Sequence, residues 1–302
     1  MKSRATSSAL RLSGIRMMCQ ASLFFSFMVV GVKVAVATLP PLEVVFFRSL
    51  FGSLMLAGLM LRKKISFRGR PEERRLLLLR AVSGFLALTL HFYTISLLPL
   101  GTAVMFNYLA IIFVAIFAVL FAGERPSLFL FLMILISFAG VYLLVDPQMT
   151  IRPGQGVAVF LGILSAVFAA VAVLTIRTIG HHESPLTVIF YFTAVSTAGS
   201  LFYLPFGFKW PNGQEWIPLL AIAVGSFYGQ LWMTIAYRRA PASLVAPFAY
   251  LTPLLSFIYG LLFWKETLAL RGVLGAILIM IGGIAISISE SRRGAKPSFT
   301  AT

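Results

Sequence analysis

Several polar and aromatic side chains that could contact a solute lie inside long apolar stretches of the sequence. They are His91, Asn107, Tyr108, Tyr228, Gln230, Trp232 and Tyr250. Polar groups in such surroundings cost free energy unless they have partners, so they usually face the interior of a helix bundle or a water-filled cavity. We therefore predict a substrate site built from neutral hydrogen-bonding and aromatic groups. The alternative is that the Tyr and Trp rings form interfacial belts and that the amides join neighbouring helices.

The depth of these residues follows from helix geometry. At ~1.5 Å per residue, the first three fall in an outer layer of the membrane and the other four in a mirrored inner layer. We expect the site to lie between the two layers. Tyr108 and Tyr250 should then occupy opposite ends of one cavity, roughly 10 Å apart along the membrane normal.

Charged residues near the span ends have structural or gating interpretations. Lys33 and Arg80 fall near the outer and inner surfaces, where their stems could snorkel toward water. Arg48 lies ~10 Å inside the second span. Glu43 begins that span and could pair with Lys33 or Arg48, although a separation of five places Glu43 and Arg48 on different helix faces. We expect a structural ion pair, and a substrate contact is the alternative.

Two prolines, Pro247 and Pro253, fall inside the predicted ninth span. Each lacks an amide donor and frees the carbonyl four residues earlier. Irregular backbone at membrane depth is tolerated where it is buried or lines a cavity. We predict that this span opens toward the substrate, and a simple packing kink is the alternative.

Catalytic and cofactor motifs are missing from the sequence. No Asp or Glu falls in the middle of a span, and His91 is the only histidine inside one, so it is the one candidate for proton coupling. The single cysteine, Cys19, excludes a disulfide framework. Without a metal motif, a phosphate-binding loop or a dinucleotide fingerprint, we predict no metal, no cofactor and no enzyme activity.

Composition indicates an integral membrane protein. Among 302 residues, 59% are hydrophobic and only 11% charged, about half the charged share of a soluble domain. Stretches of about 20 apolar residues predict ten spans. They run approximately over 17–39, 41–61, 76–98, 101–122, 128–145, 156–176, 185–205, 216–236, 242–263 and 270–289.

The basic residues predict the orientation of the spans. With the N-terminus in the cytoplasm, the inward segments hold eighteen Lys and Arg residues and the outward segments four, as the positive-inside rule requires. Both termini are therefore expected to be cytoplasmic. The net charge of +16 is explained by this bias, so no nucleic-acid partner is expected.

The chain carries an internal duplication. A shift of 142 residues superposes Tyr108 on Tyr250, Glu124 on Glu266 and five further identical residues, and a shift of 144 superposes the Pro-Leu pairs at 41 and 185. Because each copy holds five spans, the second copy must be inverted. The predicted parts are a cytoplasmic N-terminus (1–16), two repeats (17–145 and 156–289) joined by an external linker (146–155), and a cytoplasmic tail (290–302).

Three stretches carry a family resemblance. FFRSLFG (46–52), FAGERPS (121–127) and the segment from Phe263 to Gly283 resemble the drug/metabolite transporter superfamily, specifically its EamA-type members. The resemblance implies a central cavity lined mainly by spans one, three, four, six, eight and nine. It also relates Glu124 and Glu266 to the glutamates that end spans four and nine in the family, for which we favour a structural role.

These observations predict an all-α integral membrane protein with ten transmembrane helices in two inverted five-helix repeats. The predicted function is a secondary transporter in the bacterial inner membrane, acting by alternating access in the efflux direction. Its solute would be a small amino acid-like, zwitterionic or aromatic metabolite, or a drug. The expected partners are this solute and the bilayer, with a homodimer left open. A channel or a receptor-like helical protein is the alternative.

Overall fold

The computed structural model describes residues 2–122, 128–144, 155–179, 183–202, 205, 207–239, 245, 248–266 and 269–294. These residues form helices and connecting turns, with no strand among them. The first half contains α1 (Lys2–Ala35), α2 (Pro41–Lys63), a 3₁₀ turn (Pro71–Glu73), α3 (Arg74–Leu97), α4 (Leu100–Tyr108), α5 (Ala110–Ala122) and α6 (Leu128–Leu144). The second half contains α8 (Gln155–Ile179), α9 (Pro185–Leu201), α10 (Trp216–Arg239), α12 (Leu251–Trp264) and α13 (Leu270–Gly294).

The helices have the length and surface of a membrane bundle. Among the described residues, five long helices are apolar enough to cross a bilayer, and five shorter apolar helical stretches accompany them. Large apolar side chains remain exposed on many of the helices, such as Leu61, Phe160, Ile217 and Leu270, each more than 60% exposed. A soluble fold would bury many of these side chains, whereas a bilayer covers them. The predicted all-α membrane architecture is therefore confirmed.

The fourth span is broken, which the sequence did not predict. α4 ends at Tyr108, and α5 begins at Ala110 after a single turn residue, Leu109. The carbonyl of Leu109 accepts from the amide of Ile112 at 2.9 Å, a short-range bond that tightens the turn. The described part of the ninth span has a turn within one residue of the equivalent place, at Tyr250, immediately before α12.

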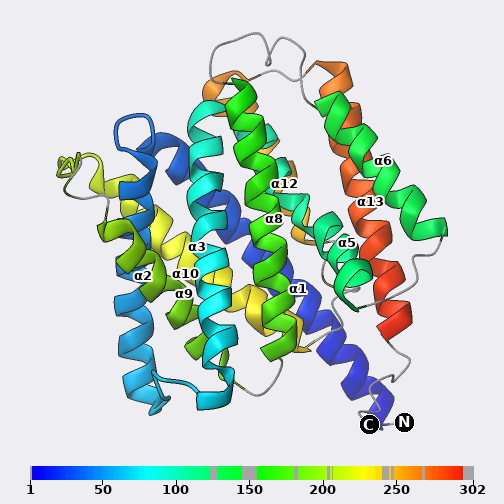
Figure 1. Cartoon of the computed structure of the whole chain (residues 1–302), viewed down its shortest axis with the longest axis horizontal. Coiled ribbons are helices and arrows are strands. Elements are labelled where there is room, and N and C mark those ends of the chain that lie inside the picture. The colour runs from blue at the N-terminus through cyan, green and yellow to red at the C-terminus, as the bar shows by residue number, and fades with distance from the viewer. Residues whose placement is uncertain are drawn as a thin grey trace.

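The helix contacts confirm the duplication. In the duplication α1 is equivalent to α8, and α10 is equivalent to α3. α1 packs on α10 and α8 packs on α3, so the same contact is present twice. α2 packs on α9 and α6 on α13, so these two pairs join equivalent helices of the two copies, and α4 packs on α12, which joins opposite halves of the equivalent fourth and ninth spans. Figure 1 shows α6 and α13 side by side at one edge of the bundle, and α2 at the opposite edge.

Close glycine contacts at the α6–α13 interface repeat the same symmetry. The carbonyl oxygen of Gly275 lies 2.7 Å from the position that a Cβ would take on Gly140. The carbonyl oxygen of Met133 lies 2.9 Å from the corresponding position on Gly282. A shift of 142 residues turns one contact into the other. The two copies are therefore related by a pseudo-two-fold axis, as in transporters built from inverted repeats.

Two pairs of equivalent residues meet across this axis and mark its course. The Cζ atom of Arg48 lies 5.3 Å from the ring centroid of Phe192, its equivalent under the 144-residue shift. The ring centroids of Tyr108 and Tyr250, equivalent under the 142-residue shift, are 5.3 Å apart. The axis therefore passes between α2 and α9 and between the two broken spans.

Candidate functional site

Two arginines lie in the bundle interior against one aromatic ring. Arg48 on α2 is 3% exposed and Arg80 on α3 is 6% exposed. Their Cζ atoms lie 5.3 and 4.7 Å from the ring centroid of Phe192 on α9, within the range of a cation–π contact. Nε and Nη1 of Arg48 and Nε of Arg80 have no hydrogen-bond partner. The burial of Arg80 shows that its expected snorkelling to the inner surface is wrong.

Small residues make room for this arrangement. A Cβ on Gly84, one helical turn after Arg80, would collide with the guanidinium of Arg80 and lie 2.9 Å from Cδ2 of Phe192. Gly84 therefore lets α3 approach the Phe192 ring with the arginine side chain between them. On α2, Gly52 plays a similar part, because its Cβ position lies 3.3 Å from Cγ2 of Thr193.

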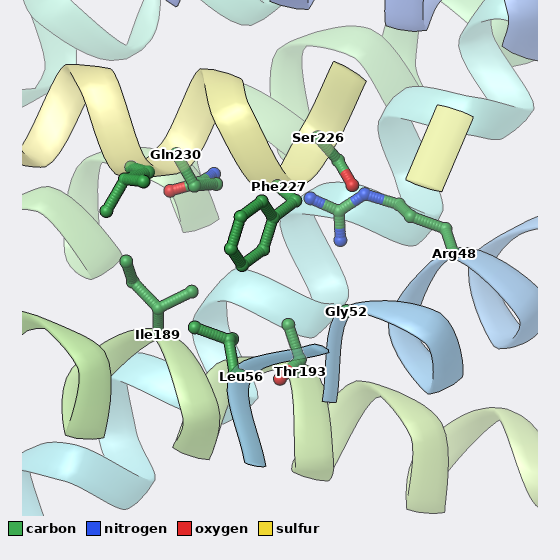
Figure 2. Close-up of a pocket in the computed structure, with 9 residues that line it drawn as sticks. Arg48, Gly52, Leu56, Ile189, Thr193, Ser226, Phe227 and Gln230 are labelled. Atoms are coloured by element: carbon green, nitrogen blue, oxygen red, sulfur yellow. The ribbon is translucent and has the colours of Figure 1, made fainter. Parts of the chain in front are cut away.

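A small cavity opens beside Arg48, and we call it the arginine pocket. Its lining comes from α2, α9 and α10 and comprises Arg48, Gly52, Leu56, Ile189, Thr193, Ser226, Phe227, Gln230 and Leu231. Figure 2 shows the guanidinium of Arg48 at one side of the pocket, beside Ser226, with Leu56 and Ile189 toward the other. The cavity volume open to water is only about 10 Å³, which is room for about one water molecule. The bundle is therefore closed around this site in the described conformation.

Of the predicted substrate contacts on α10, Gln230 alone lines the arginine pocket. Tyr228 is 38% exposed, and its ring stacks on Phe24 of α1 at a centroid distance of 5.2 Å. Trp232 packs on an apolar cluster that includes Met18 and Ala236. The structure thus places Tyr228 and Trp232 in helix packing rather than beside the pocket.

Asn107 and His91 also lie outside the pocket. The Nδ2 atom of Asn107 donates to the hydroxyl of Ser165 at 3.1 Å, and that hydroxyl donates to the carbonyl of Ala87 at 3.0 Å. This chain of bonds joins α4, α8 and α3. The His91 side chain is buried on α3 with its ring centroid 6.3 Å from that of Phe92.

Tyr108 and Tyr250 meet, and the expected separation of about 10 Å along the membrane normal is wrong. The two residues are equivalent and lie near the pseudo-two-fold axis, where equivalent positions converge at one depth. Tyr250 is 2% exposed, and its hydroxyl lies where a Cβ on Gly283 of α13 would be. The two tyrosines therefore join the broken spans to each other and to α13.

Lys33 and Glu266 form an ion pair at one end of the bundle. Nζ of Lys33 lies 3.4 Å from Oε1 of Glu266 and donates to the carbonyls of Ile95 at 3.2 Å and Leu98 at 2.7 Å. Oε2 of Glu266 accepts from the amide of Leu100 at 2.7 Å. The ion pair and its hydrogen bonds thus hold together α1, the turn between α3 and α4, and the end of α12.

The expected pairing of Glu43 with Lys33 or Arg48 is wrong. Oε1 of Glu43 instead accepts from the backbone amide of Lys209. Glu43 lies in the first turn of α2, where the helix dipole favours a carboxylate. Nζ of Lys209 in turn donates to the carbonyl of Thr38 at 3.1 Å and lies 3.4 Å from Glu215. This network ties the loop before α10 to the start of α2.

Three further predicted positions concern gating or structure. Pro253 lies in the first turn of α12, where its missing amide breaks no helical bond. Pro247 and Glu124 lie outside the described residues. Across the described part of the chain, no group of three or more His, Cys, Asp and Glu side chains is placed to hold a metal ion.

Phe192, Thr193 and Ser226 were not among the residues expected at the site from the sequence, and Arg80 was expected near the surface instead. A usable signal was present for Arg80, since Gly84 follows it by four residues and so lies on the same helix face. That spacing places an arginine over a position with no side chain, which is a way to accommodate a buried guanidinium. The other three residues become recognisable only once α2, α9 and α10 are brought together.

Comparison with known proteins agrees with this architecture. Residues 12–146 and 156–288 each match the EamA-like transporter family. The pseudopaline exporter CntI of Pseudomonas aeruginosa is 35% identical over 91% of this chain and 96% of its own, and human solute carrier family 35 member G1 is 24% identical over 84% and 73%. A solved crystal structure, 18% identical, covers 94% of this chain and 99% of its own with a TM-score of 0.65, which shows the shared fold. The chain therefore belongs to the EamA-like transporter family and is a multi-pass membrane transporter.

Proposed function

We propose that this transporter exports a small metabolite across the bacterial inner membrane by alternating access, with both termini in the cytoplasm. The observation that carries the proposal is the set of helix contacts that is preserved when the two halves are exchanged. In such a bundle each copy can adopt the conformation of the other, which converts a site open to one face into a site open to the opposite face.

The position of the arginine pocket supports the same mechanism. Arg48 lies beside the pseudo-two-fold axis, where a site can remain central while the halves move around it. In the described conformation the pocket admits about one water. A larger solute would enter only if α10 moved away from α2 and α9, so binding and helix movement are coupled.

The direction of transport is suggested by one relative. The Pseudomonas aeruginosa relative is named as an exporter of pseudopaline, and we extend export, but not that solute, to this chain. Amino acid-like or aromatic solutes, or drugs, remain the proposed cargo. We favour a structural or gating role for Lys33 and Glu266. His91 is the one candidate for proton coupling.

Counter-flow in proteoliposomes tests the proposal. Vesicles are loaded with an unlabelled solute and diluted into a trace of the same solute in labelled form. The panel comprises pseudopaline, amino acids and aromatic acids. A carrier should accumulate the label transiently above its equilibrium level for at least one solute. Uptake that only approaches equilibrium for every permeant solute would contradict alternating access and favour a channel.

A further inference from the structure

We propose that the arginine pocket binds a carboxylate group of the transported solute, with Arg48 as the direct contact and Arg80 as a second positive charge behind it. The proposal rests on the proposed export function, because it names the class of solute for that site. It narrows the cargo from small metabolites in general to those that carry at least one carboxylate.

The first support is that neither Arg48 nor Arg80 forms an ion pair with a described residue. Arg80, which contacts the same Phe192 ring as Arg48, carries a like charge. The three buried carboxylates of the described residues accept hydrogen bonds elsewhere: Glu43 from Lys209, Glu183 from Arg70 and Glu215 from Asn212. The half-buried Glu266 accepts from Leu100.

The second support is the set of unused donors. Nε and Nη1 of Arg48 and Nε of Arg80 are buried without an acceptor. A guanidinium presents its N–H groups in a planar fork that matches a carboxylate. The ring of Phe192 attracts both cations, yet a cation–π contact leaves the N–H groups in the ring plane unsatisfied. A buried charge without partners is unfavourable, so retaining two of them points to a ligand that supplies the acceptors.

The rest of the lining indicates what else the solute carries. The hydroxyls of Ser226 and Thr193 donate to the carbonyls of Ala223 and Phe190 within their own helices, at 3.0 and 3.1 Å. Their oxygens therefore remain as acceptors only. Away from Arg48 the pocket is apolar, with Leu56 and Ile189 among its walls (Figure 2). A carboxylate attached to an apolar or aromatic body matches this gradient.

The two copies differ at this site, although they match at many packing positions. Arg48 of the first copy corresponds to Phe192 of the second, and Gly84 corresponds to Ser226. Symmetric packing would be served equally well by the same residue in both copies. The charge is therefore concentrated on one side of the axis, as expected where a solute with distinct polar and apolar ends is bound.

Binding is tested on the purified full-length protein in nanodiscs by thermal unfolding. Phenylacetate is the probe, and phenylacetamide, which has the same shape without the charge, is its control. Phenylacetate should raise the unfolding temperature by about 2 °C or more at saturating concentration, and phenylacetamide should not. Chloride and inorganic phosphate are measured at the same ionic strength.

Variants separate a ligand-binding role from a structural one. Arg48→Met should abolish the phenylacetate shift and Arg80→Met should reduce it. Both should unfold without ligand at a temperature equal to or above that of the unchanged protein, because each removes an unpaired buried charge. Arg62→Met, at an exposed position in the last turn of α2, is the matched control and should keep the full shift.

Three outcomes would overturn the proposal: equal shifts with phenylacetate and phenylacetamide, a full shift retained in Arg48→Met, or a marked loss of stability in both arginine variants without ligand. An arginine-dependent shift with phosphate or chloride alone would assign the pocket to an inorganic anion instead.

Counter-flow in the same preparation distinguishes failure of the carboxylate site from failure of the proposed export function. Transport of a panel solute that phenylacetate does not inhibit would leave export standing and reject the carboxylate site. Arginine-dependent binding without any counter-flow would support the carboxylate site and reject transport by alternating access.

Discussion

The two arginines and the two tyrosines near the axis differ in how well their surroundings satisfy them. Tyr108 and Tyr250 fill space, since their rings touch and the hydroxyl of Tyr250 reaches the backbone of α13. Arg48 and Arg80 leave donor atoms unsatisfied in a region where charge is expensive. Residues that pack well explain the stability of a bundle, whereas residues that pack at a cost are better candidates for its function.

Gly84 should be as important for the site as the arginines themselves. In Gly84→Ala the new methyl group would collide with the guanidinium of Arg80 and lie 2.9 Å from the Phe192 ring. Overpacking of this kind costs about 1–3 kcal/mol of unfolding free energy. We expect Gly84→Ala to lower the unfolding temperature and to lose most of the phenylacetate shift.

Gly58 provides the matched control for this substitution. It lies within α2, and nothing lies within 4 Å of its Cβ position. Gly58→Ala should therefore be neutral, or stabilising by up to about 1 kcal/mol through helix propensity. If Gly84→Ala behaved like Gly58→Ala in both measurements, the close packing of Arg80 between Gly84 and Phe192 would be refuted.

At the scale of helices, the Lys33–Glu266 ion pair and the bonds around it hold four helices together at one end of the bundle. Lys33 comes from α1, Glu266 follows α12, and both bind backbone groups at the junction of α3 and α4. Alternating access requires elements at each end to separate in turn. A contact that joins α1, α3, α4 and α12 is suited to control that separation.

The strength of this ion pair can be measured with a double-mutant cycle. Lys33→Met or Glu266→Gln leaves a largely buried partner without its counter-charge, so each should lower the unfolding free energy by about 1–3 kcal/mol. The double variant should cost little more than either single one. The coupling energy is read from chemical unfolding of all four proteins in the same detergent.

Lys209 and Glu215 are a suitable comparison pair. Their charged atoms are also 3.4 Å apart, but the Lys209 side chain is 52% exposed whereas the Lys33 side chain is 16% exposed. Because water screens an exposed pair, its coupling energy should fall below about 1 kcal/mol. Equal coupling in both cycles would show that burial does not strengthen the Lys33–Glu266 contact, and a closing role for it would lose its basis.

The sequence predicted the number and type of helices better than it predicted which helices pack together. Apolar stretches and turn residues indicate where the helices begin and end, and repeated residues such as Glu124 and Glu266 indicate the duplication. Lateral packing leaves a weaker trace. Helix rise alone treats each span as a straight, independent rod, so it separates Tyr108 from Tyr250 and does not show that Arg80 faces the bundle interior. The break at Leu109 and the convergence of equivalent residues at the axis arise only when the two copies assemble.

At the scale of the whole molecule, two loops lie at opposite ends of the bundle and so on opposite sides of the membrane. Glu43, in the first turn of α2, binds the backbone of Lys209, so the loop before α10 lies at the start of α2. The basic segment from Arg62 to Arg75 follows from the end of the same helix. α2 is 23 residues long, or about 34 Å, which spans the ~30 Å hydrocarbon layer. The two loops must therefore lie on opposite sides of the membrane.

The charge of these loops predicts which side each one occupies, and cysteine labelling can test it. The segment from Arg62 to Arg75 carries seven basic residues, so it should face the cytoplasm. In a Cys19→Ser background, Asn212→Cys should react with a membrane-impermeant maleimide added outside intact cells, and Arg70→Cys only after the membrane is opened. Both side chains are exposed, so burial does not confound the comparison. The reverse pattern would invert the orientation and leave the fold intact. Equal labelling of both positions from outside would contradict the ten-span arrangement, because α2 would then not separate the two loops.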